Sequence, residues 1–187
     1  MSPALPAWSR PFTAAGPLDA LPPDAPRHAE LIDGVLATRP PQSAFRMFAT
    51  RLFERSLRPP AHLAVIRSMT VALGPRLMLA PDVLVVRRPA IGPATTSFRP
   101  DQVHLVCEVV PAASRERDRR TRPIRYAGAG IEHYWRVECE GDQPVVHAFH
   151  LDRDAGAYVS AGVHRGRLRL DVGFDVDIDL GLEWPPA

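Results

Sequence analysis

The chain has 187 residues, enough for one domain with a single sizeable core. Its 45% hydrophobic and 24% charged residues are ordinary for a globular protein and exclude a fibrous or globally disordered chain. The formal net charge of +2 does not by itself indicate a nucleic-acid partner. All 23 cationic side chains are arginine, which excludes any mechanism that depends on a lysine amine.

Proline is concentrated at the start of the chain, where residues 1–26 hold seven of the 21 prolines. Because proline removes backbone donors, we expect residues 1–26 to form an irregular arm and residues 27–187 to form one domain. Residues 1–12 lack the apolar core of a signal peptide, and no run approaches the ~18 apolar residues of a membrane span. We therefore expect a cytoplasmic protein without a membrane partner.

A hairpin and a helix are the first elements predicted after this arm. Residues 30–36 predict two short strands around an Asp-Gly turn, since Asp-Gly tolerates the positive φ angles of a tight hairpin. Residues 44–57 have the apolar spacing of an amphipathic helix. Two prolines at 59–60 end that helix.

A series of strands is predicted next. Residues 63–73 favour one strand, and residues 77–86 favour another that is interrupted by Pro81-Asp82. A Gly-Pro turn between the two runs indicates a hairpin. Residues 89–101 are rich in proline, glycine and threonine and predict a loop. Residues 103–110 are almost continuously apolar, which is typical of a central strand buried on both faces.

The most basic stretch, residues 114–125, contains six arginines. It predicts a helix that begins at Arg122, with Thr121 as its cap and glycines at 128 and 130 as its end. Later strands are predicted at residues 133–137, 145–151, 157–159 and 168–172, and an edge strand at 174–180. This order of elements indicates a mixed α/β or α+β sheet.

Two acidic residues interrupt the apolar strands. Asp82 follows a proline just before a strand, and Glu108 lies late in the next long strand. Since sequential strands usually pair, both carboxylates can meet at one edge of a sheet, where hard oxygen ligands suit Mg²⁺ or Mn²⁺. The alternative is that Asp82 is a turn residue and that Glu108 points to solvent. His147 and His150 lack a third ligand at a plausible spacing, which favours surface histidines.

Longer motifs support a family resemblance. They are Glu30 to Gly34, Pro81-Asp82, Glu108 to Val110, Asp118-Arg119 and Arg122 to Val137. With these motifs the chain resembles the Uma-type restriction-endonuclease family of the PD-(D/E)XK nuclease superfamily, from about Trp8 to Leu180. The resemblance implies a restriction-endonuclease-like mixed sheet flanked by helices, with extra C-terminal antiparallel strands. It also implies a metal-dependent endonuclease, a hydrolase that cuts DNA phosphodiester bonds.

The resemblance assigns roles to particular residues. Asp82 and Glu108 match the metal-binding acids, and Glu30 matches a third acid near the Mg²⁺ or Mn²⁺ ion. Arg122 takes the place of the family's lysine, and Tyr126 matches the tyrosine that follows it. In the implied reaction a metal-bound water attacks the phosphodiester while Arg122 steadies the developing negative charge.

The arginine run borders this site. We expect Arg115, Arg119, Arg120 and Arg125 to contact the phosphates of DNA. The alternative is a solvated basic surface whose arginines pair with nearby acids. The resemblance also suggests that two copies act together as a homodimer.

Three departures from the family pattern favour a second function. Arginine at 122 can grip phosphate but is a poor base, Pro111-Ala112 replace a Ser-Pro pair, and Phe45-Arg46 replace a His-Gln pair. The alternative to cleavage is therefore a catalytically degenerate nuclease-fold protein that binds nucleic acid or a protein partner without cutting.

Overall fold

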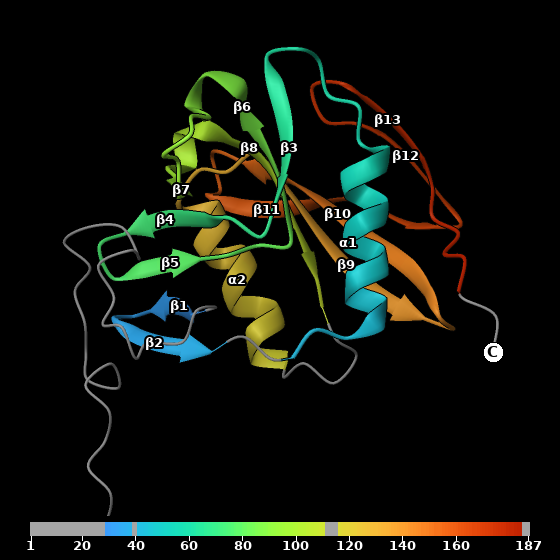
Figure 1. Cartoon of the computed structure of the whole chain (residues 1–187), viewed down its shortest axis with the longest axis horizontal. Coiled ribbons are helices and arrows are strands. Elements are labelled where there is room, and N and C mark those ends of the chain that lie inside the picture. Colours follow the sequence, from blue (N-terminus) through green and yellow to red (C-terminus); the bar gives the residue numbers. More distant parts are fainter. Residues whose placement is uncertain (1–28, 39–40, 111–115, 185–187) are drawn as a thin grey trace, which may run out of the picture.

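The computed structural model describes residues 29–38, 41–110 and 116–184 (Figure 1). For residues 116–118 it describes the backbone only. The proline-rich arm predicted at residues 1–26 lies outside these ranges. Within them the chain forms a six-stranded sheet, a five-stranded sheet, a two-stranded sheet and two α-helices. The predicted mixed α+β class is confirmed.

The six-stranded sheet has the order β11-β10-β9-β8-β6-β3. Its central pair, β8 and β9, is parallel, and every other neighbouring pair is antiparallel. The strands are β3 (Leu63–Arg67), β6 (Val83–Arg87), β8 (Val103–Val109), β9 (His133–Glu140), β10 (Gln143–Asp152) and β11 (Ala157–Arg165). The strand predicted at residues 103–110 is thus in the middle of a sheet, as its apolar run indicated.

The five-stranded sheet has the order β2-β1-β5-β4-β7. Its strands are β1 (Ala29–Ile32), β2 (Val35–Thr38), β4 (Thr70–Gly74), β5 (Leu77–Leu79) and β7 (Ser97–Phe98). The predicted hairpin around the Asp-Gly turn is confirmed, with φ angles of 54° at Asp33 and 85° at Gly34. The predicted Gly-Pro hairpin is also confirmed as the β4–β5 pair.

The prediction of one continuous strand over residues 63–73 is wrong. The chain turns at Ser68, whose φ of 54° is in the left-handed region that a strand cannot contain. As a result β3 belongs to the six-stranded sheet and β4 to the five-stranded sheet. The predicted loop at 89–101 contains the short strand β7 and parts of two 3₁₀ helices, Arg88–Ala90 and Pro100–Gln102.

Helix α1 (Ala44–Ser56) follows the prediction, and the Ser43 side chain caps it by accepting a hydrogen bond from the backbone N–H of Arg46. Helix α2 (Glu116–Gly128) begins six residues before the predicted start. Thr121 is therefore inside the helix, so the predicted cap at this residue is wrong. Charged residues such as Glu and Arg form helices well without an apolar pattern, which explains why periodicity missed the first part of α2.

The six-stranded sheet separates two apolar cores. On one side Phe53 of α1 packs with Trp135 of β9, and their ring centroids are 6.0 Å apart. On the other side Tyr126 of α2 packs near Tyr134 of β9. Neighbouring residues of a strand point to opposite faces, so β9 contributes to both cores. The helices α1 and α2 therefore cover opposite faces of this sheet.

The C-terminal strands β12 (Arg167–Asp171) and β13 (Asp175–Asp179) form a separate antiparallel hairpin. Its side chains Leu168, Val176 and Ile178 are buried in the core on the α1 side. The prediction of an edge strand near residues 174–180 is confirmed by β13, and the hairpin supplies the extra C-terminal strands that the family resemblance implied.

Candidate active site

The two acids predicted from the strand pattern lie at the same end of adjacent strands. Asp82 directly precedes β6, and Glu108 is in β8. These strands are antiparallel with Val83 opposite Cys107, so the register brings the positions of Asp82 and Glu108 opposite each other. Both side chains are buried, which excludes the alternative that Glu108 points freely to solvent.

Asp82 is held from two directions. One carboxylate oxygen accepts a hydrogen bond from Nε of Arg46 at 2.7 Å, and the other accepts one from the backbone N–H of Val109 at 2.8 Å. Arg46 is itself buried on α1. A buried carboxylate needs such partners, because it would otherwise lose several kcal/mol of hydration. Asp82 is therefore an acceptor fixed at both carboxylate oxygens rather than a simple turn residue.

Glu108 is held by helix α2. The same carboxylate oxygen accepts hydrogen bonds from the Arg122 guanidinium and from the Tyr126 hydroxyl, each at 2.7 Å. Residues four apart lie on one face of a helix, so one turn of α2 supplies both donors. Burial and the charge of Glu108 raise the pKa of Tyr126 well above its ordinary value, which keeps the hydroxyl protonated as a donor.

Glu30, in β1 of the five-stranded sheet, pairs with the same arginine as Glu108. One of its carboxylate oxygens accepts a hydrogen bond from the backbone N–H of Ala80, and the other pairs with Arg122 at 2.5 Å. Burial would lower the pKa of Arg122, but the carboxylates of Glu108 and Glu30 outweigh it and raise this pKa above its ordinary value. Arg122 is therefore a permanent cation that joins two acids from two different sheets.

Sequence reasoning missed Arg46 as a member of this site and treated it only as a departure from the family pattern. One signal for it was present. Arg46 shares a helix face with Ala49 and Phe53, and all three are buried. An arginine on the apolar face of a predicted helix requires a buried partner, and that partner is Asp82.

The arginine run has mixed surroundings. Arg125 pairs with Asp33 at 2.6 Å, and Arg119 lies 3.8 Å from Glu138. Arg120 is exposed on α2. Arg115 lies outside the described residues. The described part of the run is thus partly paired with acids of a turn and a strand and partly open to solvent, and it lies on the helix that carries Arg122.

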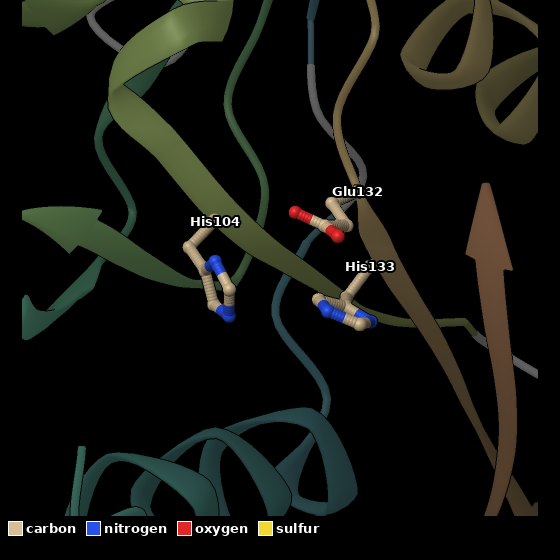
Figure 2. A group of neighbouring side chains, drawn as sticks. All are labelled: His104, Glu132 and His133. Carbon is tan, nitrogen blue, oxygen red and sulfur yellow. The ribbon is translucent and has the colours of Figure 1, made fainter. Parts of the chain in front are cut away.

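A second group of possible metal ligands was also missed by the sequence analysis. Among the described residues, His104, Glu132 and His133 bring three ligand atoms within 4.8 Å of one another (Figure 2). Burial and the neighbouring His104 lower the pKa of His133 to about 4, so this imidazole is neutral at pH 7. No regular spacing in the sequence marks this group, because His104 comes from a strand far earlier in the chain.

The hydroxyl of Tyr126 should contribute measurably to stability. We expect Tyr126→Phe to lower the free energy of unfolding by about 1.5–3 kcal/mol, because it removes a hydrogen bond to a buried carboxylate. Urea unfolding at pH 7 measures this change. Tyr158→Phe is the matched control, since Tyr158 donates to the neutral carbonyl of Ile131 and should lose only about 1 kcal/mol. Equal losses in both variants would contradict the expectation that the hydrogen bond to Glu108 is the stronger of the two.

The described architecture is that of a restriction-endonuclease-like protein, with buried acids at one end of neighbouring central strands and a helix-borne cation beside them. The chain belongs to the Uma2 family, described as "putative restriction endonuclease", whose model matches residues 17–182. No curated protein matches this sequence. No helix among the described residues is long and apolar enough to cross a membrane.

A solved structure shares the fold. It is that of a putative nuclease belonging to DUF820 from Anabaena variabilis, with 14% sequence identity and a TM-score of 0.55. The similarity covers 76% of this chain and 80% of the Anabaena protein. The restriction-endonuclease-like fold implied by the sequence motifs is therefore confirmed.

Proposed function

We propose that this protein is a metal-dependent endonuclease that hydrolyses DNA phosphodiester bonds. The observation that carries the proposal is the meeting of Asp82 and Glu108 at the same end of β6 and β8, with Arg122 bound to Glu108. Both acids are buried, and burial of ionisable groups around one place is typical of functional sites. Membership of the Uma2 family supports the same function.

Carboxylate oxygens are the type of ligand that Mg²⁺ and Mn²⁺ prefer. Three buried carboxylates face two guanidinium groups, so these five side chains carry one uncompensated negative charge. We propose that Asp82 and Glu108 hold the ion, with Glu30 as the third acid. When bound, the ion supplies charge neutralisation on the phosphate and lowers the pKa of water.

The protein side chains have separate tasks in this proposal. Arg46 and the backbone N–H of Val109 fix the carboxylate of Asp82. Tyr126 orients Glu108 through its hydroxyl. Arg122, which is permanently charged and 24% exposed, faces the substrate phosphate and stabilises its developing negative charge. Tyr126 and Arg46 are thus positioning residues, and Arg122 is a catalytic residue.

The direct test is plasmid nicking. Purified protein should convert supercoiled plasmid to open circles with Mg²⁺ or Mn²⁺ and should not do so with EDTA. Homogeneous protein that leaves the plasmid intact at millimolar Mn²⁺ would contradict the proposed cleavage.

Because a duplex has two strands, we propose that two copies cut it as a homodimer. A DNA substrate is consistent with action in the cytoplasm.

Arg119, Arg120 and Arg125 of α2 should bind the DNA backbone together with Arg115. We expect Arg120→Ala to weaken duplex binding to a similar extent for different sequences. The slope of log affinity against log salt should become shallower by about 0.9, the value for one lost phosphate contact. Fluorescence anisotropy across a salt series measures both. Arg153→Ala, in the exposed turn after β10, is the control and should keep the original slope.

One observation favours a second candidate, a nuclease-fold protein that binds nucleic acid or a protein partner without cleavage. Each of the three acids has an arginine partner, and an arginine beside a carboxylate competes with a metal ion for the same oxygens. Calorimetry with Mn²⁺ separates the two functions. Heat of Mn²⁺ binding that disappears in Glu108→Gln supports the endonuclease. DNA binding without Mn²⁺ binding supports the non-cleaving protein.

A further inference from the structure

The histidine-containing group lies at the other end of β8 from the acids. His104 is near the start of β8, His133 begins β9, and Glu132 directly precedes it. The two strands are parallel neighbours with Leu105 opposite His133, so the starts of both strands lie side by side. His104 and Glu108 are four residues apart, a distance of about 13 Å along an extended strand.

The backbone of β8 gives His104 a special position. Val85 of β6 pairs with Leu105, whereas Val86 pairs with Val103, so His104 is the extra residue of a β-bulge. Bulges locally disrupt strand pairing and change the direction of a side chain. Figure 2 shows the His104 ring turned toward the space shared with Glu132 and His133.

A backbone carbonyl sets the tautomer of His104. Its Nε2 is in hydrogen-bond contact with the carbonyl oxygen of Val172, in the turn between β12 and β13. A carbonyl only accepts, so Nε2 carries the hydrogen and Nδ1 of the neutral ring carries the lone pair. Metal-binding histidines commonly donate their second N–H to a carbonyl in this way, because the contact fixes the ring and its tautomer.

The remaining contacts in this group are weak. The rings of His104 and His133 have centroids 5.0 Å apart and are tilted by 58°, so they are neighbours but are not stacked. Arg153 lies 4.0 Å from Glu132, and both side chains are more than half exposed, so this ion pair contributes little. Strand register and the hydrogen bond to Val172 place these side chains together, while the described contacts that join the two imidazoles and the carboxylate to one another are weak.

We propose that His104, Glu132 and His133 form a binding site for a divalent transition metal ion such as Zn²⁺, separate from the acid site. Two imidazole nitrogens and one carboxylate oxygen suit Zn²⁺, whereas Mg²⁺ prefers oxygen ligands alone. Three protein ligands leave a fourth tetrahedral position for water, on the side where Glu132 is exposed. A bound ion would fasten the starts of β8 and β9 together.

Metal titration of the full chain, without a histidine tag, tests this site. Calorimetry should show one Zn²⁺ bound per chain at micromolar concentration, and Co²⁺ should give visible absorption bands that Zn²⁺ removes. Loss of an outer partner alone weakens metal binding 10–100-fold, so Glu132→Gln and His133→Ala should each weaken Zn²⁺ binding by at least about tenfold. His62→Ala, an exposed histidine outside the group, is the matched control and should bind as the original chain does.

The two metal sites can be distinguished by their variants. Asp82→Asn should keep its Zn²⁺ affinity, and Glu132→Gln should keep any Mn²⁺-dependent nicking. Glu132 is exposed, so Glu132→Gln decides the question even if His133→Ala fails to fold. Absence of Zn²⁺ binding by the original chain, or Zn²⁺ binding at full affinity by Glu132→Gln, would overturn the site. Neither result would count against the endonuclease proposal, which plasmid nicking tests separately.

Discussion

Asp82→Asn should reduce Mn²⁺-dependent nicking by at least about 10²-fold, the size of effect seen when one charge-stabilising group is removed from an active site. The amide keeps the shape of the side chain and can still accept from Val109, but it has no charge to hold the metal ion. Plasmid nicking under single-turnover conditions measures the rate. A rate equal to that of the original chain would remove Asp82 from the proposed mechanism.

Asp82→Asn also leaves Arg46 as a buried cation without its ionic partner. Breaking one side of a buried pair costs about 3–5 kcal/mol, so lost activity has to be separated from lost stability. The double variant Arg46→Met with Asp82→Asn removes both charges and should recover much of the unfolding free energy. If the proposal holds, the double variant is stable but still fails to cut DNA. Recovery of cleavage together with stability would show that Asp82 acts only in folding.

Arg122→Ala should lower the free energy of unfolding by about 3–5 kcal/mol, since it leaves the buried Glu30 and Glu108 without their shared cation. Millimolar Mn²⁺ should restore more stability to this variant than to the original chain, because the ion can replace the lost charge between the acids. Urea unfolding with and without Mn²⁺ measures both effects. An equal response to Mn²⁺ in the two proteins would contradict a metal site at these acids.

Two further variants sharpen the experiment on Arg122. Arg120→Ala, an exposed arginine on the same helix, should change stability by no more than about 0.5 kcal/mol. Arg122→Lys keeps the charge but loses the planar fork that reaches both Glu30 and Glu108. We expect it to be less stable and to cut more slowly. A strong increase in cleavage by Arg122→Lys would instead favour the view that the present chain is a degenerate enzyme.

The sequence predicted those parts of the fold that depend on local chemistry. The Asp-Gly hairpin, helix α1 and the buried strand β8 follow from turn residues, apolar periodicity and a continuous apolar run. The neighbourhood of Asp82 and Glu108 followed from the tendency of sequential strands to pair. The contact of Arg122 with Glu108 followed from the family motif, since spacing alone does not place a helix against a strand.

Other parts depend on contacts between distant residues, which no local pattern contains. The separation of β3 from β4 at Ser68 is decided by the two sheets that the strands join. The pairing of Arg46 with Asp82 connects α1 to the strand edge across 36 positions. The position of His104 depends on a bulge that is visible only in the register of β6 and β8. Sequence motifs therefore located the three acids, Arg122 and Tyr126, but not Arg46, which holds Asp82.

The bridge formed by Arg122 makes two sheets depend on each other. One end of the guanidinium holds Glu30 of the five-stranded sheet, and the other holds Glu108 of the six-stranded sheet. Separating the sheets would break at least one of these two ion pairs in a mostly buried place, so partial opening at this seam is energetically unfavourable. The residues proposed to cut DNA thus also connect the two sheets, and a variant chain without them would need other contacts between the sheets.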